Sequence, residues 1–97
     1  HNSIHGMSYE VVTSDERIDV ELSVAGKFNI YNSLCALAAA HRLGIPVDVI
    51  QKGLSRMKTV PGRFDCIDSD RGFHVIIDYA HTDDALDNVL RALRNLE

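Results

Sequence analysis

The stretch VIIDYAHTDDAL, residues 75–86, changes its hydrophobic period halfway along. Residues 75–77 are all apolar and β-branched, which predicts a short strand buried on both faces. From Leu86 onward the apolar residues recur at helical spacing and share one stripe: Leu86, Val89, Leu90 and Leu93. We therefore predict a strand followed by a helix, joined by the polar residues between them.

Polar side chains are concentrated where the period changes. In open α/β sheets ligands bind at the carboxyl ends of strands, so Asp78, Tyr79 and His81 are candidate ligand residues. Thr82 stands before two aspartates, which is typical of a helix N-cap followed by carboxylates near the positive end of the helix dipole. The residues alone leave two interpretations open: a ligand site, or ordinary turn and cap residues.

Residues 78–86, DYAHTDDAL, resemble the D-Y-A-H-T-P-D-A-L signature of the Mur ligases, most closely the MurE type, which adds the third amino acid to the UDP-N-acetylmuramoyl dipeptide. Asp83 stands where the family usually has proline, and both residues suit a first helical turn. The resemblance implies that Asp78 accepts hydrogen bonds from the ribose hydroxyls of ATP. It also assigns Tyr79 and His81 to the nucleotide site, with holding the loop as the alternative task of His81.

The segment GKFNIYN, residues 26–32, opens a predicted helix that runs to about residue 43. Asn29 and Asn32 are three residues apart, so they share a face, and each carboxamide offers the donor and acceptor needed to read an adenine edge. The alternative is that Asn29 is the N-cap and Asn32 an exposed first-turn residue. The segment resembles the G-x-(F/H)-N-x-x-N segment of the Mur ligases, which implies that both asparagines approach the adenine.

The segment VPGRFD, residues 60–65, contains a strong Pro-Gly turn and predicts a domain boundary after residue 62. It resembles the V-x-G-R-x-E junction between the central and C-terminal domains of the Mur ligases, with Asp65 in place of the usual glutamate. The resemblance implies that Arg63 reaches the nucleotide, and a guanidinium on a hinge can bind phosphate in forked geometry. The alternative is a surface arginine paired with Asp65 or with nothing.

The whole chain is predicted to be an α/β fragment. Residues 7–13 and 18–25 alternate and predict a β-hairpin with one solvated face. A second helix over residues 47–57 has a core stripe of Val47, Ile50, Leu54 and Met57. By the resemblance, residues 1–62 end the central ATP-binding domain, and a second hairpin and helix in residues 63–97 begin a Rossmann-like C-terminal domain.

Composition excludes several classes of function. The chain has 97 residues, 45% of them hydrophobic, and a net charge of -4, with basic residues scattered among the acidic ones, so no nucleic-acid surface is expected. No apolar run approaches the ~20 residues that span a bilayer. Two lone cysteines favour a reducing compartment and hence a cytoplasmic protein. We expect no metal site, and we interpret His41 and His74 as surface or hydrogen-bonded histidines.

The resemblance implies a full-length enzyme that is an ATP- and Mg²⁺-dependent amide ligase of peptidoglycan precursor synthesis. Its partners would be a UDP-N-acetylmuramoyl peptide, activated as an acyl phosphate, and an amino acid whose amine attacks it. The phosphate loop, magnesium ligands, carbamylated lysine and UDP-binding domain are expected before residue 1, and the amino-acid-selecting motif after residue 97. We therefore expect no catalytic residue here and no activity from the isolated chain.

Two alternatives remain open. A related ligase of the folylpolyglutamate or cyanophycin synthetase type would share an Asp-x-Ala-His core, although Tyr79 and Thr82 fit the MurE type better. A non-catalytic module that dimerises through exposed half-cores is the other alternative.

Overall fold

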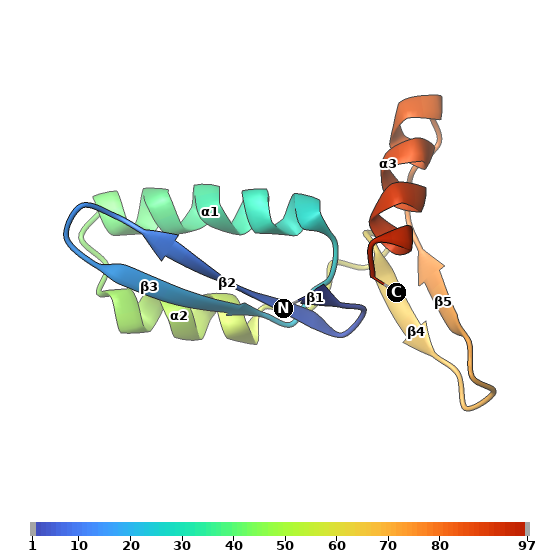
Figure 1. Cartoon of the computed structure of the whole chain (residues 1–97), viewed down its shortest axis with the longest axis horizontal. Coiled ribbons are helices and arrows are strands. Elements are labelled where there is room, and N and C mark those ends of the chain that lie inside the picture. The colour runs from blue at the N-terminus through green and yellow to red at the C-terminus, as the bar shows by residue number, and fades with distance from the viewer. Residues whose placement is uncertain (1, 97) are drawn as a thin grey trace.

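The structure is a computed structural model that describes residues 2–96. It confirms an α/β fold built from strands in two small sheets and three helices (Figure 1). Two parts lie side by side along the long axis: residues 2–62, here called the first half, and residues 63–96, the second half. Their elements, in chain order, are β1 (Asn2–Ser3), β2 (Gly6–Val12), β3 (Arg17–Leu22), α1 (Lys27–Arg42), α2 (Val47–Arg56), β4 (Asp65–Asp68), β5 (His74–Ile77) and α3 (Asp83–Arg94).

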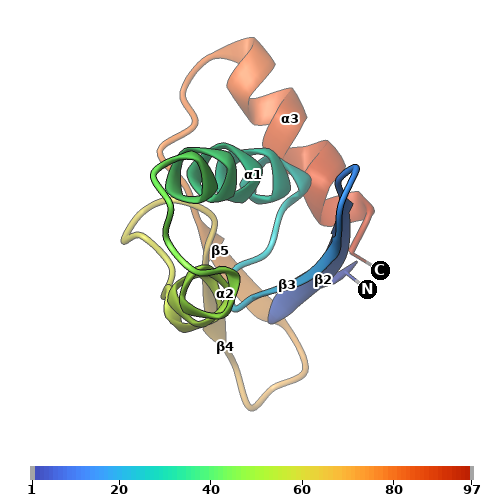
Figure 2. The ribbon, with the colours of Figure 1, turned by 90° about the vertical axis from the view of Figure 1, so that its left-hand side faces the viewer.

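The first half is an antiparallel sheet, β1-β2-β3, with both helices on the same face (Figure 2). The predicted alternation is confirmed, because β3 buries every second residue and exposes Asp19 and Glu21. β1 was not predicted: it is two residues long, and its pairing of Asn2 with Met7 depends on a tight turn rather than on any periodicity.

The core of the first half lies between this sheet and the two helices. Its buried members are Met7, Ile18, Val20, Leu22, Leu37, Ile50 and Leu54. The predicted stripe of α2 is confirmed at Ile50 and Leu54 and wrong at Met57, which is 48% exposed. The helix ends at Arg56, and Met57 has an extended backbone, so it no longer continues the helical spacing of the stripe.

The second half is a two-stranded antiparallel hairpin, β4-β5, followed by α3. The prediction that residues 75–77 are buried on both faces is wrong for this chain, because Val75 is 43% and Ile77 44% exposed. Only Ile76 packs on a buried cluster. Among residues 2–96, β5 pairs with β4 alone, and the face of the hairpin that carries Val75 and Ile77 stays exposed.

Apolar side chains of the two halves pack together in a small cluster. Ala25, Phe64 and Ala92 are buried there, and the ring of Phe28 meets that of Phe64 edge-on with centroids 5.4 Å apart. Phe64 has a positive φ of 48°, a conformation that L-residues seldom adopt. The boundary turn therefore directs the ring of Phe64 into the first half, and the cluster anchors the second half.

Candidate functional site

A cavity of about 520 Å³ opens between the start of α1, the segment after β5, and α3. The lining joins two of the segments that the sequence singled out, because Lys27 and Phe28 come from the first and Asp78 and Ala80 from the second. The complete lining is Lys27, Phe28, Tyr31, Asp78, Ala80, Ala85, Asn88, Val89, Arg91, Ala92 and Asn95.

Asp78 follows the last residue of β5 and is half-buried. Its Oδ2 accepts a hydrogen bond of 2.8 Å from the backbone N–H of Phe64, and its Oδ1 accepts one of 2.8 Å from that of Ala80. The carboxylate thus ties the boundary turn to the loop before α3. Because an ionised carboxylate has about four acceptor positions, Asp78 can still accept further hydrogen bonds from a ligand.

Arg63, Tyr79 and His81 form a row. The guanidinium carbon of Arg63 lies 5.0 Å from the centroid of the Tyr79 ring, within cation–π range. The rings of Tyr79 and His81 meet edge-on at 5.1 Å. No ion pair joins Arg63 to Asp65 in the part of the chain that the structure describes. These three side chains are exposed and do not line the cavity.

The imidazole of His81 has a defined tautomer in its neutral form. Its Nδ1 lies 3.0 Å from the carbonyl oxygen of Tyr79, and because a carbonyl can only accept, Nδ1 must carry the proton. Nε2 is then an acceptor. His81 therefore holds its own loop and still offers a ring nitrogen outward.

The two asparagines lie in the first turns of α1. The N-cap of this helix is Gly26, so the alternative in which Asn29 is the N-cap is wrong. Asn29 donates from Nδ2 to the Ala25 carbonyl at 2.7 Å, and its Oδ1 accepts from Nδ2 of Asn32 at 3.4 Å. Neither asparagine lines the cavity, so the described contacts do not join them to Asp78.

Charge is unevenly distributed around the cavity. Lys27 and Arg91 are its cations and Asp78 its carboxylate. A hydrogen bond of 2.7 Å from Nε of Arg91 to Asp87 raises the pKa of the guanidinium. The Arg91 side chain therefore stays charged while its orientation is set by the residue one helical turn earlier.

Sequence reasoning missed the contribution of α3 to the cavity. Asn88, Ala92 and Asn95 are separated by four and three residues, so they share one helix face. That spacing was a usable signal.

Sequence reasoning also missed a second group: His5, Asp68 and His74 offer ligand atoms that all lie within 4.8 Å of one another. Asp68 and His74 are cross-strand partners, a relation that needs the register of the hairpin. Cys66 lies beside them, with its thiol 3.8 Å from Oδ1 of Asp68. Partial burial raises the pKa of the Cys66 thiol and the Asp68 carboxylate raises it further, so the thiol stays protonated at neutral pH.

Known proteins match this chain by sequence over nearly its whole length, although no family model matches it. It is 43% identical over 91 residues to the UDP-N-acetylmuramoyl-L-alanyl-D-glutamate--2,6-diaminopimelate ligase of Halalkalibacterium halodurans, covering 94% of the chain and 19% of the relative. It is 40% identical over 96 residues to the ligase of the same name from Caldanaerobacter subterraneus, covering 99% of the chain and 20% of the relative.

Solved structures match it as well. MurF from Acinetobacter baumannii superposes with a TM-score of 0.78 at 24% identity, over 99% of the chain and 20% of that structure, which supports the fold. A pseudomurein peptide ligase type C from Methanothermus fervidus superposes with a TM-score of 0.71 at 34% identity, over 95% of the chain and 18% of that structure.

The sequence matches cover nearly the whole chain but only a small part of each relative. The chain spans about a fifth of the length of the curated relatives it matches. None of the helices formed by residues 2–96 could span a lipid bilayer. On the sequence matches, which agree with the three motifs and with the fold, the chain is homologous over nearly its whole length to a segment of the MurE-type Mur ligases.

Proposed function

We propose that this chain is the adenosine-binding segment of an ATP-dependent amide ligase of the MurE type, acting in peptidoglycan precursor synthesis. One observation carries the proposal: a single cavity is lined by both the GKF segment at the start of α1 and the Asp78–Ala80 segment after β5. Two motifs about fifty residues apart in sequence thus share one ligand-sized space.

The cavity suits a nucleoside. Its volume of about 520 Å³ lies within the usual range for small-molecule sites. Phe28 and Tyr31 offer aromatic surface for a base, Asp78 offers acceptor positions for ribose hydroxyls, and Lys27 offers a charge for a phosphate. Asn29 and Asn32, two residues after Lys27 and one after Tyr31, would read the adenine edge at the rim.

Arg63, Tyr79 and His81 are proposed to serve the phosphate end and the hinge. The ring of Tyr79 lies under the guanidinium of Arg63, and this contact restricts the orientations that the guanidinium can adopt. A planar guanidinium can bind a phosphate through two parallel hydrogen bonds. Because Arg63 follows the boundary turn directly, movement of the second half would move this contact with it.

The full-length enzyme would transfer the γ-phosphoryl group of ATP to a carboxylate of a UDP-N-acetylmuramoyl peptide, forming an acyl phosphate and ADP. An amine of the incoming amino acid would then attack the acyl carbon and release inorganic phosphate. The name shared by the relatives makes 2,6-diaminopimelate the proposed amino acid. The lone thiols of Cys35 and Cys66 suit a cytoplasmic enzyme.

Magnesium, which the reaction needs to neutralise charge on the phosphates, has no fitting site among residues 2–96. The one described cluster of three potential ligands contains two imidazoles, whereas Mg²⁺ prefers oxygen ligands in an octahedral shell. We therefore propose that the ions and the phosphate loop belong to other parts of the full-length enzyme, and that this chain alone turns over no ATP.

Binding of ATP to the chain tests the proposal without requiring activity. In a ¹⁵N-HSQC titration, shifts are expected at Lys27, Phe28 and Ala80 together. Tyr31→Ala and Asn32→Ala should each weaken binding about two- to tenfold, the loss of one contact. Asn2→Ala, an exposed asparagine in β1, is the matched control and should leave the affinity unchanged. Shifts confined to one half, or an Asn2→Ala effect as large as that of Asn32→Ala, would count against the proposal.

A second candidate, self-association, is favoured by exposed apolar residues on the second half. Val75, Ile77, Leu86 and Leu90 are 43–63% exposed. Sedimentation velocity with and without ATP separates the two functions. A monomer that binds ATP supports the ligase segment, whereas a tight dimer indifferent to ATP supports a dimerising module.

A further inference from the structure

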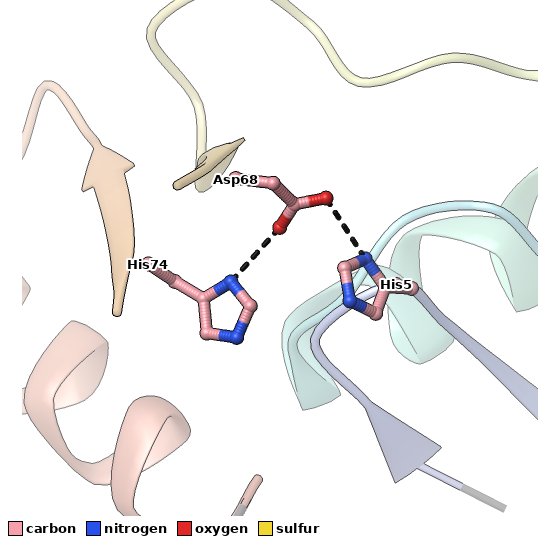
Figure 3. Close-up of side chains that lie close together, drawn as sticks. All are labelled: His5, Asp68 and His74. Atoms are coloured by element: carbon pink, nitrogen blue, oxygen red, sulfur yellow. Dashed lines mark hydrogen bonds and ion pairs between the residues drawn. The ribbon is translucent and has the colours of Figure 1, made fainter. Parts of the chain in front are cut away.

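A histidine–aspartate–histidine cluster joins the two halves at a point away from the nucleotide cavity (Figure 3). Asp68 lies between the two rings, each of which faces one of its carboxylate oxygens. Oδ1 of Asp68 is 2.8 Å from Nδ1 of His74, and Oδ2 is 3.7 Å from Nδ1 of His5. The two imidazole centroids are 5.6 Å apart.

The backbone brings these side chains together from distant parts of the chain. Asp68 and His74 are direct cross-strand partners in the β4-β5 hairpin, where facing side chains lie about 5 Å apart. His5 sits in the tight turn between β1 and β2. Its backbone N–H donates to Oγ of Ser3 at 3.3 Å, and Oγ of Ser3 donates to the Gly6 carbonyl at 3.1 Å. His5 is thus held by a hydrogen-bonded turn, and Asp68 and His74 are held by paired strands.

We propose that His5, Asp68 and His74 bind one divalent transition-metal ion, with Zn²⁺ as the type case, and that this ion bridges the two halves. Two imidazole nitrogens and one carboxylate oxygen are a ligand set typical of zinc sites that keep a fourth position for water. The set does not suit Mg²⁺ or Ca²⁺, which prefer oxygen ligands.

The geometry needs only a small adjustment. The three ligand atoms lie within 4.8 Å of one another, whereas ligands at about 2.0–2.2 Å from a tetrahedral ion lie roughly 3.4 Å apart. The side chains of His5 and Asp68 are each 61% exposed and that of His74 is 44% exposed, so their torsions are free to close this difference. A neutral ring that moves its proton to Nε2 presents the Nδ1 lone pair to the ion.

Such an ion would hold the two halves together beside a second cavity. His5 also lines a cavity of about 300 Å³ whose walls include Ala25, Lys58, Phe64 and Cys66, from both halves. None of the three ligands lines the 520 Å³ nucleotide cavity. The ion would therefore fix the position of the β4-β5 hairpin relative to the first half without competing with ATP.

Calorimetric titration of the chelator-treated chain with Zn²⁺ tests the stoichiometry and the ligands. We expect one equivalent to bind and expect His5→Ala, Asp68→Asn and His74→Ala each to weaken it at least tenfold, since even residues that merely orient zinc ligands cost 10- to 100-fold. His41→Ala is the matched control, because His41 also lies beside a carboxylate, at 3.4 Å from Glu16, but without a third ligand. Circular dichroism checks that each variant is folded. If His5→Ala or His74→Ala does not fold, His5→Gln or His74→Gln is used in its place.

The bridging claim has its own readout. In a ¹⁵N-HSQC spectrum, one equivalent of Zn²⁺ should shift the amides of Ser3–Gly6 and of Asp68 and His74 together. The proposal is overturned if no Zn²⁺ binds, if His41→Ala weakens binding as much as His74→Ala, or if His5→Ala binds as tightly as the unsubstituted chain. Unchanged binding by His5→Ala would mean that the Zn²⁺ site lies on the β4-β5 hairpin alone and does not bridge the halves. Because no step depends on ATP, failure of the nucleotide proposal leaves this test unaffected.

Discussion

The two halves of this chain bury their apolar residues to very different degrees. In the first half, two helices cover one face of a sheet, and Ile18 and Val20 are 2% and 0% exposed. In the second half, one helix lies beside a two-stranded hairpin, and Leu90 is 63% exposed. A two-stranded sheet is marginal by itself, so stability is expected to reside in the first half, with the second half held through the cluster around Phe64.

Truncating one leucine in each half should give the largest contrast. Leu54→Ala removes a buried side chain from the core of the first half and should lower the free energy of unfolding by about 2–5 kcal/mol. Leu90→Ala removes the same atoms from an exposed position and should change it by no more than about 0.5 kcal/mol. Urea unfolding followed by circular dichroism measures both.

The contrast would fail if Leu90→Ala proved as destabilising as Leu54→Ala. Such a result would mean that Leu90 is buried in solution, for example between two copies of the chain. Sedimentation of the Leu90→Ala variant would then decide whether a dimer had been lost.

The link between the halves can be weakened at Asp78. Asp78→Ala removes the acceptor of the Phe64 and Ala80 amides, and hydrogen bonds to a charged group are worth about 1.5–3 kcal/mol. Hydrogen exchange should accelerate at both amides and through β5 and α3, while β3 stays protected. Asp70→Ala, at an exposed turn position, is the control and should leave exchange unchanged. Faster exchange in β3 would show that the halves unfold as one unit.

Most of the fold could be predicted from local signals. The alternation from Ile18 to Leu22 follows from one buried and one solvated face of the strand. Both ends of α1 and α2 and the start of α3 were predicted to within about a residue, because Gly44, Pro46 and Thr82 mark helix limits. Burial of residues 75–77 could not be predicted. An apolar sequence shows that a strand is able to be buried. Whether it is buried depends on which other elements cover it.

The candidate site was predictable in part. Motifs predicted Asp78, Arg63, Tyr79 and His81 as site residues. The structure brings Asp78 to the start of α1, and the binding roles of all four stay predictions. The pairing of Asp68 with His74 depends on strand register, and their approach to His5 depends on the packing of the two halves. Neither relation leaves a trace in local spacing, so the histidine–aspartate–histidine cluster could not be predicted.

Loss of the helix cap should have a smaller and more local effect. Oγ1 of Thr82 accepts a hydrogen bond of 3.3 Å from the Ala85 amide at the start of α3. Thr82→Ala should cost about 1 kcal/mol, and Thr82→Ser, which keeps the hydroxyl, should recover most of it. Hydrogen exchange at Ala85 and Leu86 reports the change. Equal exchange in the alanine and serine variants would mean that the cap contributes nothing.

The smallest expected effect is a gain within the first half. Gly53 lies inside α2, and a Cβ added there would meet no atom within 4 Å, so Gly53→Ala should stabilise the chain by about 0.5–1 kcal/mol by lowering the entropy of the unfolded state. Gly44 offers equal space but has φ of +82°, so Gly44→Ala is the matched control and should destabilise. Comparing the free energies of unfolding of the two variants in urea separates the effect of backbone conformation from the effect of packing. If both variants were stabilised, Gly44 would have to adopt a different backbone conformation in solution, whereas a loss at Gly53 would mean that α2 is frayed there.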